Sequence, residues 1–241
     1  IGYSWYHALQ ARVEKRFSHG YTLQASYTHS KYMQATEFLN PTDPVPYRMI
    51  SDMDRPNLFS MSALWEIPVG QGRRYFSNAP GPLNAIIGGW QLNADEVHQS
   101  GQPLAWGSIT SNCTCTTSSI IFTGNIKDIP LPAGQRSVDH WFNTAGFNTV
   151  TAQQLANNIR TFPLRFSGIR AEGQTIFNLS LIRNYHIAER LSAQFRAEVY
   201  NALNHPVFST PNTTPTSSAF GTITSDVSEP REWQFALKFL F

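Results

Sequence analysis

The sequence predicts an all-β chain whose antiparallel strands belong to a transmembrane β-barrel. In Glu232–Phe241 apolar residues occupy every second position, which gives a strand one apolar face. Charged residues make up 14% of the chain and aromatic residues 13%, whereas roughly 25% of residues are charged in typical soluble domains. No apolar run approaches the length of about eighteen residues that a transmembrane helix needs. Because only helices and closed barrels satisfy their backbone polar groups in lipid, the barrel is favoured.

Two long strands open the chain. The first is predicted over residues 5–17, with an apolar face interrupted only by Lys15. Ser18-His19-Gly20 is a hairpin signal, so the second strand begins at Tyr21 and runs to about residue 32. One face of this second strand has no hydrophobic residue as far as residue 30, so we expect it to face water. The proline-rich residues 33–56 then predict a long loop.

The middle of the chain predicts two further strands. The third covers about residues 57–67, and a connection over 68–88 follows, with a helical turn expected near 83–87. The fourth strand begins at Gly89 and alternates until Glu96 and His98 fall on its apolar face. Either a bulge shifts the register there, or these two side chains lie above the lipid band.

The rest of the chain predicts one very long loop and three strands. Residues 101–173 are irregular, which argues against a compact soluble domain but is normal for the outer loop of a barrel. A short strand is expected at residues 119–123. The remaining predicted elements are a fifth strand at 175–187 with Arg183 on its apolar face, a tight turn at 188–190, a sixth strand at 191–203, a loop at 204–231 and a seventh strand at the end.

Three further features favour a membrane barrel over an ordinary β-sandwich. Several strands reach eleven or more residues, against about 5–6 in soluble sheets and about 9–11 in tilted membrane strands. Tight turns and long loops alternate, so the predicted periplasmic connections are 18–20, 68–88 and 188–190. Aromatic residues sit at strand ends, which resembles the two girdles of a barrel. These residues are Trp5, Phe17, Tyr21, Trp65, Trp90, Tyr185, Trp233 and Phe241.

The predicted strand number indicates part of a larger barrel. Bacterial single-chain barrels have even strand numbers, whereas about seven strands are predicted here, with an open edge at the first. The sequence begins with Ile1 and no signal peptide precedes the first strand. We therefore expect residues 1–241 to be the C-terminal segment of a longer chain.

Several phrases of the sequence resemble the C-terminal part of the Oar-like TonB-dependent transporter barrels. The phrases are Gly88-Gly89-Trp90-Gln91-Leu92-Asn93, Gln99-Ser100-Gly101-Gln102-Pro103, Trp141-Phe142-Asn143, Phe195-Arg196-Ala197-Glu198-Val199-Tyr200-Asn201-Ala202-Leu203-Asn204-His205-Pro206, Phe220-Gly221-Thr222-Ile223-Thr224 and Leu237-Lys238-Phe239-Leu240-Phe241. The resemblance spans essentially the whole chain. It implies a 22-strand barrel of the bacterial outer membrane with a plug and a TonB-box, both absent from this sequence. It also implies energised uptake of a substrate that the sequence does not identify.

The resemblance implies three partners: outer-membrane lipid, the barrel-insertion machinery, and the TonB complex, which would bind through an N-terminal region absent here. The terminal apolar row resembles part of the signal that the insertion machinery reads. Its members are Trp233, Phe235, Leu237, Phe239 and Phe241. The net charge of +2 is too small to suggest nucleic acid.

Candidate substrate-binding residues are charged side chains on the polar strand faces, which would either line a substrate path or pair with one another and with a plug. They are Arg12, Glu14, Arg16, Arg196 and Glu198. In the first outer loop, Asp52, Asp54 and Arg55 could bind a cation or a ligand, although a solvated turn before Pro56 is the simpler expectation.

The remaining candidates for chemistry are weak. Asp139 and His140 lack an accompanying nucleophile motif. Cys113 and Cys115 lack further ligands at metal-site spacing, so they predict a loop feature without metal. We expect no cofactor and no enzymatic activity. A passive porin-like barrel and a soluble all-β surface or adhesion module remain as alternative functions.

Overall fold

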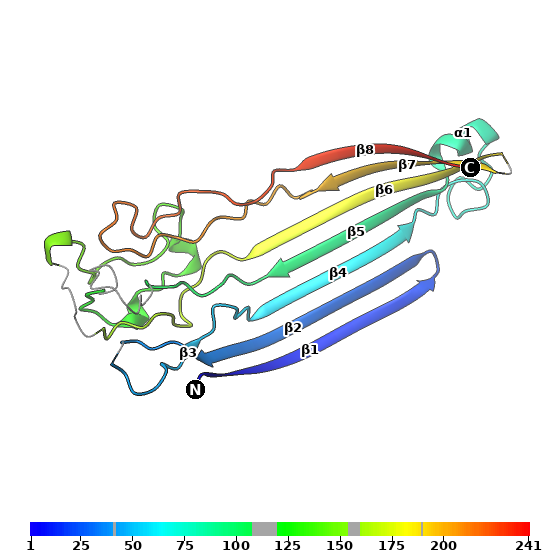
Figure 1. The fold of residues 1–241 in the computed structure, drawn as a ribbon. Coiled ribbons are helices and arrows are strands. Elements are labelled where there is room, and N and C mark those ends of the chain that lie inside the picture. Colours follow the sequence, from blue (N-terminus) through cyan, green and yellow to red (C-terminus); the bar gives the residue numbers. More distant parts are fainter. Residues whose placement is uncertain (41, 108–119, 154–159, 189) are drawn as a thin grey trace.

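The structure, a computed structural model, describes residues 1–40, 42–107, 120–153, 160–188 and 190–241. Within them, seven long strands form one antiparallel sheet in which each strand pairs with the next along the chain (Figure 1). Their bounds are β1 Tyr3–Ser18, β2 Tyr21–Ala35, β4 Asn57–Glu66, β5 Trp90–Gln99, β6 Gln174–Ala188, β7 Leu191–Tyr200 and β8 Glu232–Leu240. An eighth strand, β3 Met49–Ile50, pairs with the end of β2, and helix α1 Gly81–Ile87 lies between β4 and β5.

All seven predicted strands are present, together with the predicted helical turn, which forms α1. Strand β2 runs to Ala35 rather than to about residue 32, and two further differences from expectation follow. The short strand β3 lies inside the predicted loop 33–56, where it extends the pairing of β2. Strand β7 ends at Tyr200 rather than at residue 203, because Asn201 adopts a positive φ of 45° that cannot continue a strand.

The register places the predicted apolar positions on one continuous face of the sheet. One row across neighbouring strands joins Val13, Ala25, Met61, Glu96 and Phe177, each paired with the next. We call this side the apolar face and the opposite side the polar face. Since side chains alternate along a strand, one register fixes both faces at once.

The pairing of β5 resolves the question of its register. Pairs run without a shift from Leu58 with Gln99 to Glu66 with Gln91, and the pairing with β6 is equally regular. The bulge considered for this strand is therefore absent. Glu96 stays on the apolar face, in the half of β5 that leads into the long loop. The bulges that do occur lie beside the tight turns, at the end of β1 and at the end of β6.

The connections are sorted between the two ends of the sheet (Figure 1). One end, here called the turn end, carries the β1–β2 turn, the connection 67–89 and the β6–β7 turn. The other, the loop end, carries the loops 36–56, 100–173 and 201–231. At the turn end His19 and Gly20 both have positive φ, 55° and 83°, which is the geometry that two-residue hairpins favour. This sorting is the one that the alternating loop lengths predicted.

The sheet is open, because β1 and β8 are its two edges and do not pair with each other. In lipid such edges must be covered by further pairing, since unpaired backbone groups are costly there. The described residues therefore form a sheet of barrel strands rather than a closed barrel, and the total of 22 strands stays a prediction.

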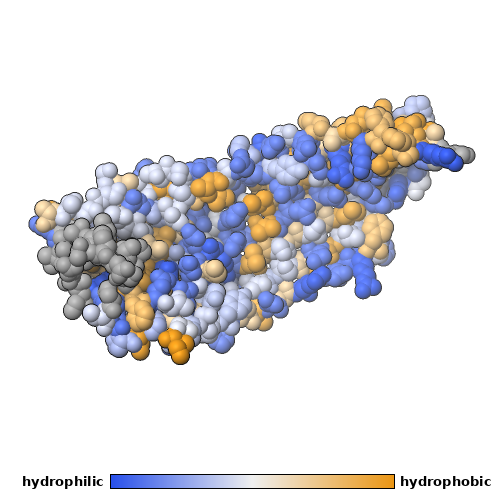
Figure 2. Space-filling view, viewed as in Figure 1, coloured by the Kyte–Doolittle hydropathy of each residue, from blue (hydrophilic) through white to orange (hydrophobic). Residues whose placement is uncertain are grey.

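The buried hydrophobic clusters of the described residues lie among the loops at the loop end. Large side chains on the apolar face of the sheet are exposed instead. They include Leu9, Val13, Trp65, Phe235 and Leu237. Figure 2 shows mainly hydrophilic residues along the middle of the sheet face turned to the viewer, and hydrophobic residues gathered at the turn end. The exposed side chains of the apolar face therefore mark contact with a membrane or a partner.

The two faces predict different costs for neighbouring substitutions in β7. Ala197→Arg places a guanidinium between Leu181 and Phe235 on the apolar face, which should destabilise a membrane-inserted barrel by about 2–4 kcal/mol. Glu198→Gln on the polar face should cost much less. Unfolding of the inserted variants in denaturant measures both, and equal costs would show that β7 is not half in lipid.

Candidate functional site

Loop 100–173 has its own aromatic core around Trp106, which is fully buried. The indole stacks on Phe147 with ring centroids 5.3 Å apart, and meets Phe142 and Phe162 edge-on at 5.0 and 5.2 Å. Phe220 of loop 201–231 joins this cluster at 6.5 Å from Trp106. Described residues of loops 100–173 and 201–231 thus form one packed layer, here called the cap. Aromatic rings in these arrangements attract one another beyond simple area burial.

Three arginines of the returning segment of loop 100–173 hold loop 36–56 in place. Arg160 exchanges hydrogen bonds with Asn40, with its backbone N–H 2.6 Å from the Asn40 side-chain oxygen. Arg165 donates to Glu37 and to the Ile50 carbonyl. Burial lowers the pKa of Arg160 to about 10, so its guanidinium remains charged at neutral pH and donates to carbonyls of the cap, including Phe162 O at 2.7 Å.

The third arginine, Arg170, forms a buried ion pair with Asp54. Arg170 Nη2 lies 2.5 Å from Asp54 Oδ2, and Asp54 is 0% exposed. The other carboxylate oxygen of Asp54 accepts the Tyr32 backbone N–H at 2.5 Å. The expectation of a solvated turn is therefore wrong for Asp54, because the cap covers it, whereas Asp52 is exposed.

Three of the phrases that carry the sequence resemblance meet in the cap. A Cβ on Gly101 would lie 1.9 Å from the Ala171 carbonyl oxygen, so only glycine permits this close approach of the two ends of loop 100–173. The Trp141 backbone N–H donates to Gly221 O at 2.9 Å, and its indole N–H donates to Arg170 O at 2.8 Å. These phrases therefore fix contacts between loops.

Two asparagines close the stems of loop 201–231. The Asn201 side chain donates to His205 O at 3.2 Å and to Glu229 O at 3.0 Å. Asn204 Oδ1 accepts the Arg231 backbone N–H at 3.2 Å. Both residues have positive φ, which asparagine tolerates better than most residues. These bonds hold the exit of β7 beside the entry of β8.

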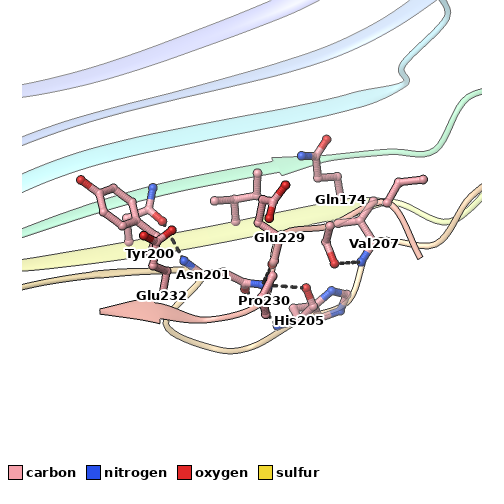
Figure 3. Close-up of a pocket in the computed structure, with 12 residues that line it drawn as sticks. Gln174, Tyr200, Asn201, His205, Val207, Glu229, Pro230 and Glu232 are labelled. Atoms are coloured by element: carbon pink, nitrogen blue, oxygen red, sulfur yellow. Dashed lines mark hydrogen bonds between the residues drawn. The ribbon is translucent and has the colours of Figure 1, made fainter. Parts of the chain in front are cut away.

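A cavity of about 510 Å³ lies between loop 201–231 and the polar face of the sheet, and we call it the mouth groove. Its strand residues all come from the polar face of β6, β7 and β8 at the loop end. In Figure 3, Tyr200 and Glu232 lie at one end, His205 and Val207 at the other, and Glu229 between them. Gln174, Val207 and Val227 also line a neighbouring cavity of about 390 Å³, so the two cavities share walls.

The walls of these cavities combine apolar side chains, among them Ile176, Val207 and Val227, with polar ones. Carboxylates are supplied by Glu229 and Glu232, and by Glu172 of the neighbouring cavity. Among the described atoms, Glu172 Oε2 and His205 Nδ1 are buried without a hydrogen-bond partner, and such groups gain from a ligand that satisfies them. Burial, and then the charge of Arg170, lower the pKa of Arg55, which lines the same cavity.

Sequence reasoning missed the mouth groove because its walls come from three strand ends and one loop. The only available signal was Asn204-His205-Pro206, the strand exit at which the predicted loop 204–231 begins. Asp226 lines an adjoining cavity that shares Ser228 and Glu229 with the groove. Its pKa is lowered by the Ser228 backbone N–H and then by the Ser228 hydroxyl.

The predicted substrate-binding residues lie on the polar face and outside the mouth groove. Arg12 pairs with Glu14 at 3.2 Å, with their side chains 60% and 50% exposed. Arg196 lies 3.9 Å from Glu198. The first pair is on β1 and the second on β7, with four strands between them in the sheet, so the structure does not bring the two pairs together. Arg16 lies in the bulge at the end of β1.

The weaker candidates form no site in the described part of the chain. Asp139 and His140 are exposed in a tight turn closed by Ser137. Cys113 and Cys115 lie outside the described residues, as do Ser119 of the predicted short strand and Glu189 of the predicted tight turn. No group of three or more metal-ligating side chains occurs among the described residues. None of the helices in this part of the chain is long and apolar enough to cross a membrane.

The terminal apolar row lies along edge strand β8. Trp233, Phe235, Leu237 and Phe239 are exposed on the apolar face, and Phe241 follows the last strand residue at the turn end. Trp233 and Phe235 stack with ring centroids 6.4 Å apart. The row is accessible as one continuous strip, and its role as an assembly signal stays a prediction.

Long antiparallel strands, one continuous apolar face, one polar face and a sorted set of turns and loops together define an integral β-barrel membrane protein. The chain belongs to the outer membrane beta barrel domain family, whose model matches residues 1–234. Its location is therefore the bacterial outer membrane, and the exposed apolar face is consistent with contact with outer-membrane lipid. Comparison with curated proteins and with solved structures found no match.

The buried and exposed ion pairs predict different losses of stability. Arg170→Ala would leave Asp54 charged and unpaired in the cap, which should cost about 3–5 kcal/mol. Arg12→Ala removes an exposed pair and should cost at most about 1 kcal/mol. Thermal unfolding followed by Trp fluorescence, with proteolysis of the outer loops, compares them. Similar losses for both variants would contradict the buried ion pair.

Deletion of Phe241 tests the terminal row. Burial of one Phe side chain contributes only about 1.5–3 kcal/mol, too little to decide whether a large barrel stays folded. If Phe241 acts in assembly, its deletion should sharply lower the amount in the outer membrane while the inserted protein melts near the wild-type temperature. Normal abundance with a large fall in melting temperature would make Phe241 a packing residue instead.

Proposed function

We propose that this chain is the C-terminal barrel segment of a TonB-dependent transporter that takes up a solute across the outer membrane. The observation that carries the proposal is the mouth groove, which lies between the packed cap and the polar face. In an outer-membrane barrel the polar face lines the lumen, and the long loops face outward. The groove is therefore a place where a solute from outside first meets the lumen wall.

The packed cap favours selective uptake over passive diffusion. A porin needs a permanently open aqueous path, whereas here three loops are joined by an aromatic core and by buried arginines. Thr213 Oγ1 donates to Ala105 O at 2.7 Å and so ties loop 201–231 to loop 100–173. A solute bound beneath such a layer requires a conformational change for release, which is a step that an energy source can drive.

The chemistry of the groove supports a role for specific residues. Tyr200 offers an aromatic surface, and Glu229 and Glu232 offer hydrogen-bond acceptors. Gln174 offers both donors and acceptors. The TonB dependence, the plug and the TonB-box rest on the family resemblance of the sequence, and so does the insertion machinery as a partner.

Electrical recording separates energised uptake from passive diffusion. For the outer-membrane protein in planar bilayers, with potassium chloride as the probe, we expect no steady conductance, because the closed transporter has no continuous aqueous path. Constant conductance steps would support the porin alternative and would contradict the proposal.

Copurification with the periplasmic domain of TonB is the second test. We expect the outer-membrane protein to retain this domain and an unrelated porin of the same membrane to release it. Absence of binding together with a closed barrel in bilayers would contradict the TonB dependence while leaving the groove as a binding site.

A further inference from the structure

Helix α1 lies against the apolar face of the sheet at the turn end. Trp90, Arg183 and Phe195 form one cross-strand row on that face. Two of them hold the helix: the Trp90 indole N–H donates to Ile86 O at 2.8 Å, and Arg183 donates to Ile86 O at 2.8 Å and to Asn84 O at 3.1 Å. The connection 67–89 therefore folds back over the side of the sheet that is consistent with lipid contact.

Helix α1 exposes hydrophobic side chains and turns a polar side chain inward, which is the reverse of a helix on the surface of a soluble protein. Leu83 and Ile86, one turn apart, are 41% and 68% exposed. The polar side chain of Asn84 points toward its own connection, where its Oδ1 accepts the Gln71 backbone N–H at 2.7 Å. In water, the hydrophobic pair would be the buried one, because removal of such side chains from water is favourable.

Arg183 explains how the helix is held. A guanidinium on the apolar face is costly unless it is covered and hydrogen-bonded. Arg183 is only 6% exposed, and its cation lies 4.3 Å from the Tyr185 ring centroid and 5.5 Å from that of Trp90. It binds carbonyls at the C-terminus of α1, where a cation is favoured by the exposed carbonyl dipoles. Arg183, which interrupts the predicted apolar pattern of its strand, therefore holds α1 against the sheet, and we call it the clamp.

We propose that α1 is an interfacial foot that inserts Leu83 and Ile86 into the inner leaflet of the outer membrane, at the boundary of acyl chains and headgroups. The turn end faces the periplasm in barrels of this kind, which places α1 at that leaflet. Short amphipathic segments bind such a boundary through their apolar side chains and through cations near lipid phosphates. Here the exposed Arg74 of the same connection supplies a cation, whereas Arg73 pairs with Glu66 at 3.2 Å.

Lipid is the occupant that the geometry selects. Helix α1 lies on the apolar face and leaves Leu83 and Ile86 exposed there. Trp65 and Tyr185 lie at the same end of β4 and β6, the two strands that flank β5. Aromatic side chains of this kind mark the interface of membrane barrels. The foot does not depend on the transported solute or on TonB, so it goes beyond the proposed function.

A fluorescent probe tests the position of α1. The outer-membrane protein, with Cys113 and Cys115 replaced by Ser, carries NBD on Ile86→Cys or, as a matched control, on Gln71→Cys. Both proteins are reconstituted in phosphatidylethanolamine–phosphatidylglycerol vesicles containing headgroup-proximal doxyl lipid. Quenching at position 86 should be stronger than at position 71 by about twofold or more, with a blue-shifted emission, since the apolar side of an interfacial helix lies below the headgroups.

Equal quenching at the two positions in vesicles would overturn the proposal. A blue shift at position 86 that occurs only in native membranes, and not in pure lipid vesicles, would show a protein partner and would overturn it as well. As a second variant, Arg183→Met removes the clamp and should reduce the difference between the two probes. Heat-modifiable gel migration shows whether this variant keeps its fold. If the fold is kept and the quenching difference between positions 86 and 71 is unchanged, Arg183 does not hold α1 in place.

Discussion

The rest of the structure depends on one constraint: a backbone that crosses lipid must pair all its polar groups within the protein. The long strands obey it through uninterrupted antiparallel pairing, and even β5 keeps its register where Glu96 falls on the apolar face. Irregular backbone is confined to the ends of the sheet. The bulges lie beside the tight turns, and the loops gather at the opposite end.

A second consequence is that the hydrophobic core of the described chain is not in the sheet. One face of the sheet meets lipid and the other meets water, so neither can hold a compact core. The loops supply it instead, around Trp106, and buried side chains such as Asn40 and Asp54 join loops that are distant in sequence. The cap is therefore built like a small soluble domain, whereas the sheet is built for a bilayer, and the mouth groove lies where the two meet.

The strands could be predicted from the sequence because an alternation of period two is visible within ten residues. The cap could not, because the partner of Arg170 lies 116 residues away and nothing local distinguishes a buried aspartate from a solvated one. For the same reason the mouth groove was missed. The two cations that interrupt the apolar pattern have partners that the sequence does not reveal. Lys15 lies over the Tyr21 ring at 3.6 Å, and Arg183 binds a helix whose position no local signal reveals.

The ion pair between Arg170 and Asp54 also bears on the order in which the molecule folds. Each long strand pairs with its neighbour along the chain, so the sheet can grow by adding one hairpin at a time. Asp54 precedes β4 and Arg170 precedes β6, so alignment of β4, β5 and β6 brings the two side chains together. Contacts of such sequence separation form late, because the entropy of closing the intervening chain must first be offset. This ion pair therefore closes late in folding, after the three strands have found their register.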